Sequence, residues 1–162
     1  MLFIGLAVAI VIYPFFHEAG HCLATLLVGG EIVEYHLFPL PNVLCQVSNV
    51  KTMGRVFIGI FGMLLPIIIS LLIYCPKKAF GIWYAKLILQ GICLLSLVIT
   101  FVATILFSLG NPVANEDITT VLRLAPNLVG IAIIASLFAS TVLTIIILKD
   151  HPVKRIRDYL LE

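Results

Sequence analysis

The segment "HEAGH", residues 17–21, places His17, Glu18 and His21 in a run that is otherwise apolar. It matches the pattern H-E-x-x-H, in which two histidines are four positions apart. On an α-helix these positions share one face, so both imidazoles can bind one tetrahedral Zn²⁺. Glu18 lies next to that face, where it can take a proton from a zinc-bound water and pass it to a leaving amine. The spacing predicts one Zn²⁺ per chain, bound by His17 and His21, with Glu18 as the catalytic base.

The surroundings of this motif favour a functional role for it. The residues from Leu2 to Phe16 and from Cys22 to Gly30 include no charged side chain. A charged group at the centre of a bilayer costs at least about 2.5–3.5 kcal/mol, so ionisable residues at that depth are functional by default. Two surface histidines would be the ordinary explanation in a soluble protein. A polar cluster that only ties helices together is another, although Ser or Asn would serve at lower cost.

The composition indicates an all-α polytopic membrane protein. Of the 162 residues, 62% are hydrophobic and 11% are charged, whereas a soluble domain carries about a quarter charged residues. Four transmembrane helices are predicted within a single membrane-embedded domain, residues 1–162, and they cover about residues 2–30, 56–75, 80–110 and 124–148. Residues 149–162 form a polar, basic tail. No basic patch interleaved with aromatic residues is present, so no nucleic-acid partner is predicted.

The segment between the first two spans predicts a small β-ribbon at the membrane surface, over about residues 31–50. It begins with good strand formers and continues with a period-2 alternation of apolar and other residues. The strand formers are Ile32, Val33 and Tyr35, and the alternating residues are Val43, Cys45 and Val47.

A catalytic zinc site needs a third protein ligand and an open fourth position. If each span crosses the membrane once, residues 110–123 lie on the same membrane face as Gly30. His21 precedes Gly30 by about nine residues, which puts it roughly 13 Å in from that face. The acidic pair Glu116 and Asp117 can dip towards it, so Asp117 is the first choice for the third ligand and Glu116 the alternative. Either carboxylate could instead be an ordinary charge at a helix N-terminus.

Other possible ligands fit the expected topology less well. Asp150, His151 and Asp158 follow one more crossing and belong to the opposite face. The ribbon residues Glu31, Glu34 and His36 are on the right face, but an outward-pointing strand would have to fold back to bring them to the metal.

The stretch "HEAGHCLATLLVGGEIVEY", followed by a ribbon, further spans and an Asn-Pro…Asp segment, resembles the site-2 protease family of intramembrane zinc metalloproteases. Many members have Asn-Pro, two residues and then Asp-Gly. Here Asn111-Pro112 is separated from Asp117 by residues 113–116, and Ile118 replaces the glycine. The departure indicates a small, divergent branch that consists mostly of the catalytic core.

The resemblance implies hydrolysis of a peptide bond in or near a transmembrane segment of a membrane-spanning or membrane-anchored protein substrate. The substrate helix must unwind to expose its amides, and the ribbon could receive it as an added strand. Asn111 could donate a hydrogen bond to the substrate or the oxyanion, although turn formation is a commoner use for Asn before Pro.

Two other functional classes deserve comparison with the protease. A non-proteolytic membrane scaffold or chaperone could retain a zincin-like core. A metal-ion transporter would need polar residues along a path through several spans, and the second span offers only Ser70 and Tyr74.

Loop charges predict the orientation in the membrane. Six cations lie on one face and three on the other, so the positive-inside rule makes the C-terminal tail cytoplasmic. The six are Lys77, Lys78, Lys149, Lys154, Arg155 and Arg157, and the three are Lys51, Arg55 and Arg123. The active site would then open outward, whereas site-2 proteases generally work near the cytosolic face.

Overall fold

A computed structural model describes residues 1–36, 41–76, 79–114 and 116–161. Within these residues, four helices are long and apolar enough to cross a membrane, and they run Leu2–Leu27, Thr52–Leu72, Phe80–Ser108 and Pro126–Leu161. The predicted fold class is therefore confirmed: four candidate spans, with a small antiparallel ribbon between the first and the second.

The first span contains the histidine motif and is not a uniform helix. It consists of α1 (Leu2–Ala7), a π-helical turn (Val8–Ile12) and α2 (Tyr13–Leu27). Pro14 lies in the first turn of α2. Its missing N–H cannot bond the carbonyl four residues back, and this explains why the helix loosens just before it. The span ends at Leu27 rather than at Gly30, because Gly29 takes a positive φ of 79° and the Gly30 N–H bonds the Thr25 carbonyl at 2.9 Å.

The ribbon has two strands, β1 (Glu31–His36) and β2 (Asn42–Gln46). They pair antiparallel, with Tyr35 opposite Val43 and with an irregularity between Ile32 and Glu34. The prediction extended the ribbon over residues 31–50, of which residues 37–40 lie outside the described part of the chain.

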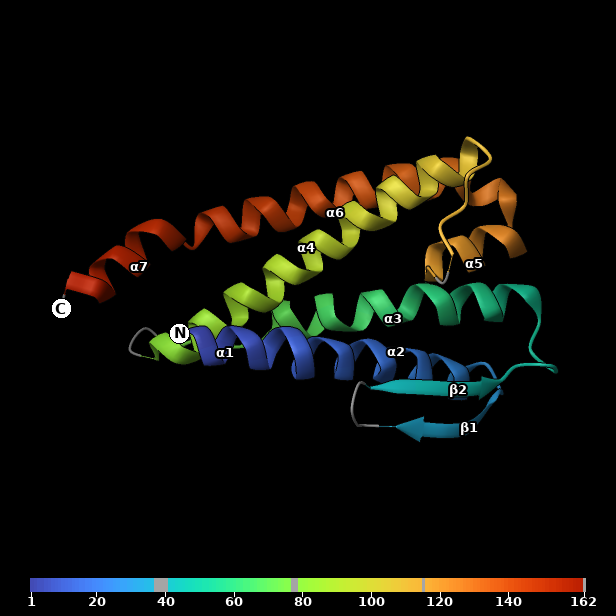
Figure 1. The fold of residues 1–162 in the computed structure, drawn as a ribbon, viewed down its shortest axis with the longest axis horizontal. Coiled ribbons are helices and arrows are strands. Elements are labelled where there is room, and N and C mark those ends of the chain that lie inside the picture. Colours follow the sequence, from blue (N-terminus) through green and yellow to red (C-terminus); the bar gives the residue numbers. More distant parts are fainter. Residues whose placement is uncertain (37–40, 77–78, 115, 162) are drawn as a thin grey trace.

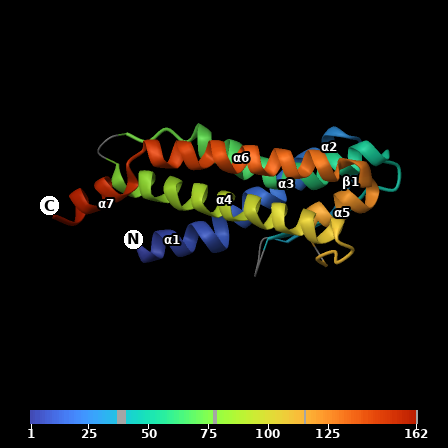
Figure 2. The same ribbon diagram turned by 90° about the horizontal axis from the view of Figure 1, so that it is seen from above.

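The remaining helices are α3 (Thr52–Leu72), α4 (Phe80–Ser108), α5 (Asp117–Leu124), α6 (Val129–Lys149) and α7 (Pro152–Leu161). Figure 1 shows α2 running along α3, while α4 crosses away from them and α6 lies beside α4. Figure 2 shows the same arrangement from above. The segment after the third span forms the separate helix α5, and a 3-10 turn (Pro126–Leu128) leads into α6. The predicted tail contains a helix, α7.

Figure 1 shows that successive spans run in alternating directions, as expected if each span crosses the membrane once. The ends of α2 and α4, the start of α3, the ribbon and α5 lie at one end of the molecule, and both chain termini lie at the other (Figure 1). The described residues of this loop, 110–114 and 116–123, are therefore at the end of the molecule where α2 ends, as predicted.

Helix α5 is held in place by its apolar face. Ile118, Val121, Leu122 and Ala125 follow the i, i+3, i+4, i+7 spacing of a buried helical stripe. They form one buried cluster with Val56 of α3 and Ala103 of α4. Because α5 begins at Asp117, this packing sets the position of that carboxylate.

Candidate metal centre

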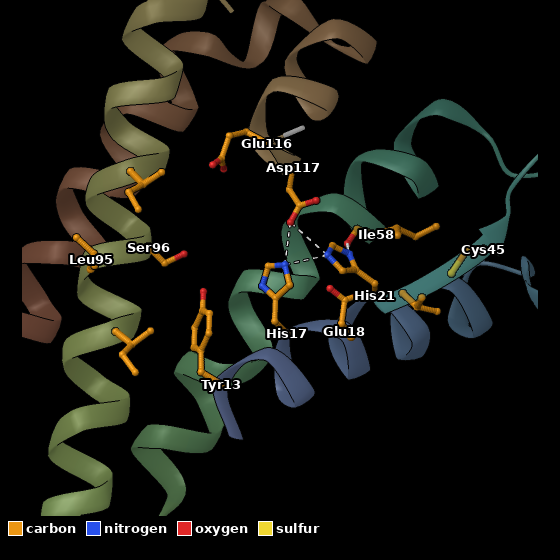
Figure 3. A pocket seen from close by; sticks show the side chains of 13 residues that line it. Tyr13, His17, Glu18, His21, Cys45, Ile58, Leu95, Ser96, Glu116 and Asp117 are labelled. Atoms are coloured by element: carbon orange, nitrogen blue, oxygen red, sulfur yellow. Dashed lines mark hydrogen bonds and ion pairs between the residues drawn. The ribbon is translucent and has the colours of Figure 1, made fainter. Parts of the chain in front are cut away.

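Three side chains from two distant segments converge between α2 and the start of α5. The Nε2 atoms of His17 and His21 are 3.3 Å apart. The Asp117 Oδ2 atom is 3.0 Å from the Nε2 atom of His17 and 3.2 Å from that of His21. Figure 3 shows the two rings projecting from α2 and the carboxylate reaching them from the start of α5. Among the described residues, these three make up the group of His, Cys, Asp and Glu side chains able to hold a metal ion.

The tautomer of His21 follows from its other ring nitrogen. Its Nδ1 atom is 2.9 Å from the carbonyl oxygen of Ile58 on α3. A carbonyl can only accept a hydrogen bond, so Nδ1 carries the proton and donates it. The neutral ring then presents an electron pair at Nε2, directed at the Asp117 carboxylate, which is also an acceptor. Such a meeting of electron pairs is stable only with a cation between them, either a proton or a metal ion.

The geometry suits zinc. At metal–ligand lengths of about 2.0–2.1 Å, two ligand atoms of a tetrahedral site are about 3.3–3.4 Å apart. The three observed separations, 3.0, 3.2 and 3.3 Å, are close to that value. The Ile58 carbonyl supplies the kind of outer hydrogen bond that usually orients a metal-bound histidine. The donor set, two imidazoles and one carboxylate, is one that zinc commonly takes.

Glycines allow the three elements to approach closely. A Cβ atom at Gly20 of α2 would collide with the Phe61 carbonyl oxygen of α3, and one at Gly62 of α3 would collide with the His21 ring. At Gly59, a Cβ would come within 2.5 Å of the Val121 side chain of α5. The close packing that these glycines permit is concentrated at the histidine motif.

The Asp117 carboxyl is ionised in this environment. Burial by itself would raise its pKa, but hydrogen bonding and attraction to His17 and His21 outweigh that effect and hold the pKa well below its usual range. The Asp117 side chain keeps 43% of its surface exposed, while His21 keeps 12%. The carboxylate therefore reaches the histidines from the rim of a cavity.

That cavity has a volume of about 610 Å³ and lies between α2, β2 and α4. Glu18 extends into it beside His21 (Figure 3). Val43 and Cys45 of β2 line a second wall, and Ser96 of α4 lies on the opposite side. The cavity thus gives a small molecule or an extended chain access to the three convergent side chains and to Glu18.

The other predicted site residues lie elsewhere. Glu116 lines the cavity, but it is not part of the three-residue group. Asn111 is exposed after the end of α4, and it is not among the described residues that line the cavity. On the ribbon, His36 Nε2 and Glu34 Oε1 are 2.7 Å apart and both side chains are exposed. Crossing parity assigned Asp150, His151 and Asp158 to the opposite face. They belong to the segment from the end of α6 through α7, and Figure 1 shows α7 at the end of the molecule opposite to the β-ribbon.

Sequence reasoning missed Tyr13 and Ser96. Both line the cavity, and their side chains point towards each other across it (Figure 3). Tyr13 precedes His17 by four residues, and the two ring centroids are 5.9 Å apart. The i−4 spacing could have identified Tyr13, because it continues the helical face that carries the two histidines. Ser96 follows no local pattern that would single it out.

The fold and this site define the class: an integral membrane protein with a preformed His/His/Asp centre that faces a cavity. A family model described as Peptidase M50B-like matches residues 5–113, which is more than half of the chain. The chain belongs to this family, a group of membrane metallopeptidases, and the site-2 protease resemblance is confirmed. M50 peptidases are generally zinc-dependent. No curated protein and no solved structure gave a significant match. The matched range includes the histidine motif and ends before Asp117.

Proposed function

We propose that this protein is an intramembrane zinc endopeptidase. Its substrate would be a membrane-spanning or membrane-anchored protein, cleaved at a peptide bond in or near the transmembrane segment. The observation that carries the proposal is the convergence of His17, His21 and Asp117 beside Glu18, at a cavity between candidate spans. Membership of a metallopeptidase family supports the same reaction class.

His17, His21 and Asp117 would hold one Zn²⁺ per chain. When bound there, the ion acts as a Lewis acid that polarises the scissile carbonyl and makes a water molecule more acidic. The role of the chain is to keep both imidazole electron pairs and the carboxylate aimed at one point. The hydrogen bond from His21 Nδ1 to the Ile58 carbonyl serves this purpose.

Glu18 is the proposed general base and acid. Its carboxylate accepts a proton from the attacking water and later delivers it to the amine nitrogen of the leaving peptide. Proton transfer by a positioned side chain contributes about 10²–10⁴-fold to a rate. The proposal is supported by the location of Glu18, next to His17 in the chain and on the wall of the same cavity.

Tyr13 is a better candidate than Asn111 for donating a hydrogen bond to the substrate carbonyl. A donor must reach the place where negative charge develops on the carbonyl oxygen. Tyr13 lines the cavity together with both histidines, whereas Asn111 is exposed and is not among its described lining residues. We therefore assign Tyr13 the electrostatic role that the family resemblance implied for Asn111.

Strand β2 is the proposed docking edge for the unwound substrate. One edge of β2 pairs with β1, and in the described sheet the other edge has no strand partner. Val43 and Cys45 of β2 line the cavity, so a chain added to that free edge would pass the metal centre. Within the ribbon, β2 rather than β1 is therefore the proposed substrate-binding strand.

The lipid bilayer is the second proposed partner, and the C-terminal tail is proposed to be cytoplasmic on the basis of the loop charges. The cavity and the metal centre would then open towards the opposite side.

A Glu18→Gln variant tests the proposed mechanism. It should retain zinc, because Glu18 is not among the three convergent ligands, and it should lose peptide cleavage by about 100-fold or more. The measurements are zinc content of purified protein and cleavage of transmembrane model peptides in vesicles. Unchanged cleavage would remove Glu18 from the mechanism. Stable zinc without hydrolysis of any membrane peptide by the wild type would favour the scaffold or chaperone alternative.

A further inference from the structure

A second cavity, with a volume of about 350 Å³, adjoins the metal centre. His21, Cys45, Ile58 and Asp117 line both this cavity and the large one. The two cavities therefore meet at the metal centre. The large cavity contains Tyr13, which lies deeper in the first span, and the second contains Arg55, near the start of α3 and thus near the ribbon end of the molecule.

Arg55 is a fixed cation in this cavity. Its Nε donates to the Val50 carbonyl at 3.0 Å, and its Nη2 donates to the Ser48 carbonyl at 3.1 Å. A guanidinium has five N–H groups, so these two bonds orient it and leave further donors. Among the described residues, no carboxylate forms an ion pair with it. A half-buried, pre-oriented guanidinium of this kind is suited to bind a carboxylate from another molecule.

The direction of β2 connects the two cavities. Val43 and Cys45 line the large cavity, while Cys45 and Val47, the residue directly after the end of β2, line the second. Alternate residues of a strand share a face and are about 6.6–6.8 Å apart. A substrate strand on the free edge of β2 would therefore extend from the large cavity, past the metal centre, into the cavity that holds Arg55.

We propose that Arg55 is a specificity residue that binds an acidic side chain of the substrate. That Asp or Glu would lie within about four residues of the cleaved bond, on the side that leads towards the ribbon end of the molecule. This inference rests on the proposed peptidase function and adds a preference to it. The occupant is a substrate carboxylate rather than a lipid phosphate, because the same cavity also contains His21, Asp117 and the β2 wall.

The test uses the full chain in phosphatidylcholine vesicles and a set of transmembrane model peptides. The peptides are grouped in threes. The members of a group differ only at one position near the cleaved bond, which is Glu, Gln or Lys. The wild type should cleave the Glu peptide about fivefold faster than the Gln peptide at one such position. Arg55→Gln should bring this ratio close to one. Arg55→Glu should reverse the order, so that the Lys peptide becomes the best substrate. Lys51→Gln removes a neighbouring exposed cation that does not line the cavity, and it should keep the wild-type ratio.

Reversal of the preference cannot come from a misfolded protein, and it separates charge recognition from the structural role of Arg55 at residues 48–50. Equal cleavage of the Glu and Gln peptides by the wild type would overturn the inference, as would an unreversed order in Arg55→Glu. If added phosphatidylglycerol reduces peptide binding and the wild type shows no preference for the Glu peptide, Arg55 binds a lipid phosphate instead of a substrate carboxylate. Binding of the same peptides to Glu18→Gln, followed by fluorescence anisotropy, decides the inference even if no peptide is cleaved. In that case the peptidase proposal fails and the Arg55 preference is judged by affinity alone.

Discussion

Asp117, at the start of α5, meets the side chains of His17 and His21 on α2. A carboxylate 3.0 and 3.2 Å from two imidazole nitrogens forms a site in which each atom offers an electron pair to a common cation. Glu116, one residue earlier, lines the same cavity without joining the group. The position of the first residue of α5 thus brings the Asp117 carboxylate to the histidines and leaves the adjacent, chemically similar Glu116 carboxylate outside the group.

We expect Asp117→Ala to lower the affinity for zinc by more than about 100-fold, because outer-shell changes alone cost about 10–100-fold. Glu116→Ala is the matched control and should keep its zinc. The measurement is zinc content and competition with a chelator, with His17→Ala as the reference for a lost ligand. Full zinc in Asp117→Ala together with loss in Glu116→Ala would exchange the roles of the two residues.

Tyr13 gives a second prediction at this scale. Tyr13→Phe keeps the ring beside His17 and removes only the hydroxyl, so kcat should fall by about 100-fold while zinc content stays the same. Tyr74→Phe, at an exposed position outside the lining of the cavity, should have no effect. If kcat is unchanged in Tyr13→Phe, the hydroxyl has no part in the reaction and Asn111 again becomes the candidate donor.

At the scale of the element, the site depends on how closely α2 and α3 approach. Gly20 and Gly62 face each other where the helices meet, and no side chain would fit at either position without displacing its neighbour. The approach brings the Ile58 carbonyl of α3 within 2.9 Å of His21 Nδ1. Helix α5 packs against α3 at Gly59, and this contact positions Asp117 at the start of α5.

Gly62→Ala tests this approach. Its Cβ would overlap the His21 ring, so the ring must tilt and its Nε2 atom must leave the common point. We expect a loss of zinc affinity of about 10–100-fold, comparable to other disturbances around a ligand. Gly91→Ala in α4 is the control, because nothing lies within 4 Å of the added Cβ. An unchanged zinc affinity in Gly62→Ala would show that the helices can separate without loss of the site.

In the whole molecule, the four candidate spans place both chain termini at one end. The β-ribbon, α5 and the C-terminal end of α2 lie at the other end. In an integral membrane protein with this arrangement, the candidate metal centre would open towards one side of the bilayer. Which side depends on loop charges rather than on packing inside the bundle.

Reporter fusions test the orientation. A reporter that is active only in the cytoplasm should be active when fused at the C-terminus and inactive when fused after Gly30. The reason is that crossing parity predicts six loop and tail cations on the side of the C-terminus and three on the other. The opposite pattern would place the metal centre near the cytosolic face. A fusion after Ser108 provides an internal check, since it must agree with the fusion after Gly30.

Features that depend on short spacing could be predicted from the amino-acid sequence. The i, i+4 histidines share a helical face in any helix, runs of about 20 apolar residues predict spans, and period-2 alternation predicts the ribbon. Crossing parity, which requires only the number of spans, narrowed the third ligand to two residues. Tertiary structure alone brought Asp117 rather than Glu116 to the two histidines, placed Tyr13 opposite Ser96, and turned β2 rather than β1 towards the cavity. These outcomes depend on the packing of segments that are far apart, such as His21 and Asp117, 96 residues apart. Their relative rotation is set by glycine contacts and buried clusters, and local periodicity carries no information about it.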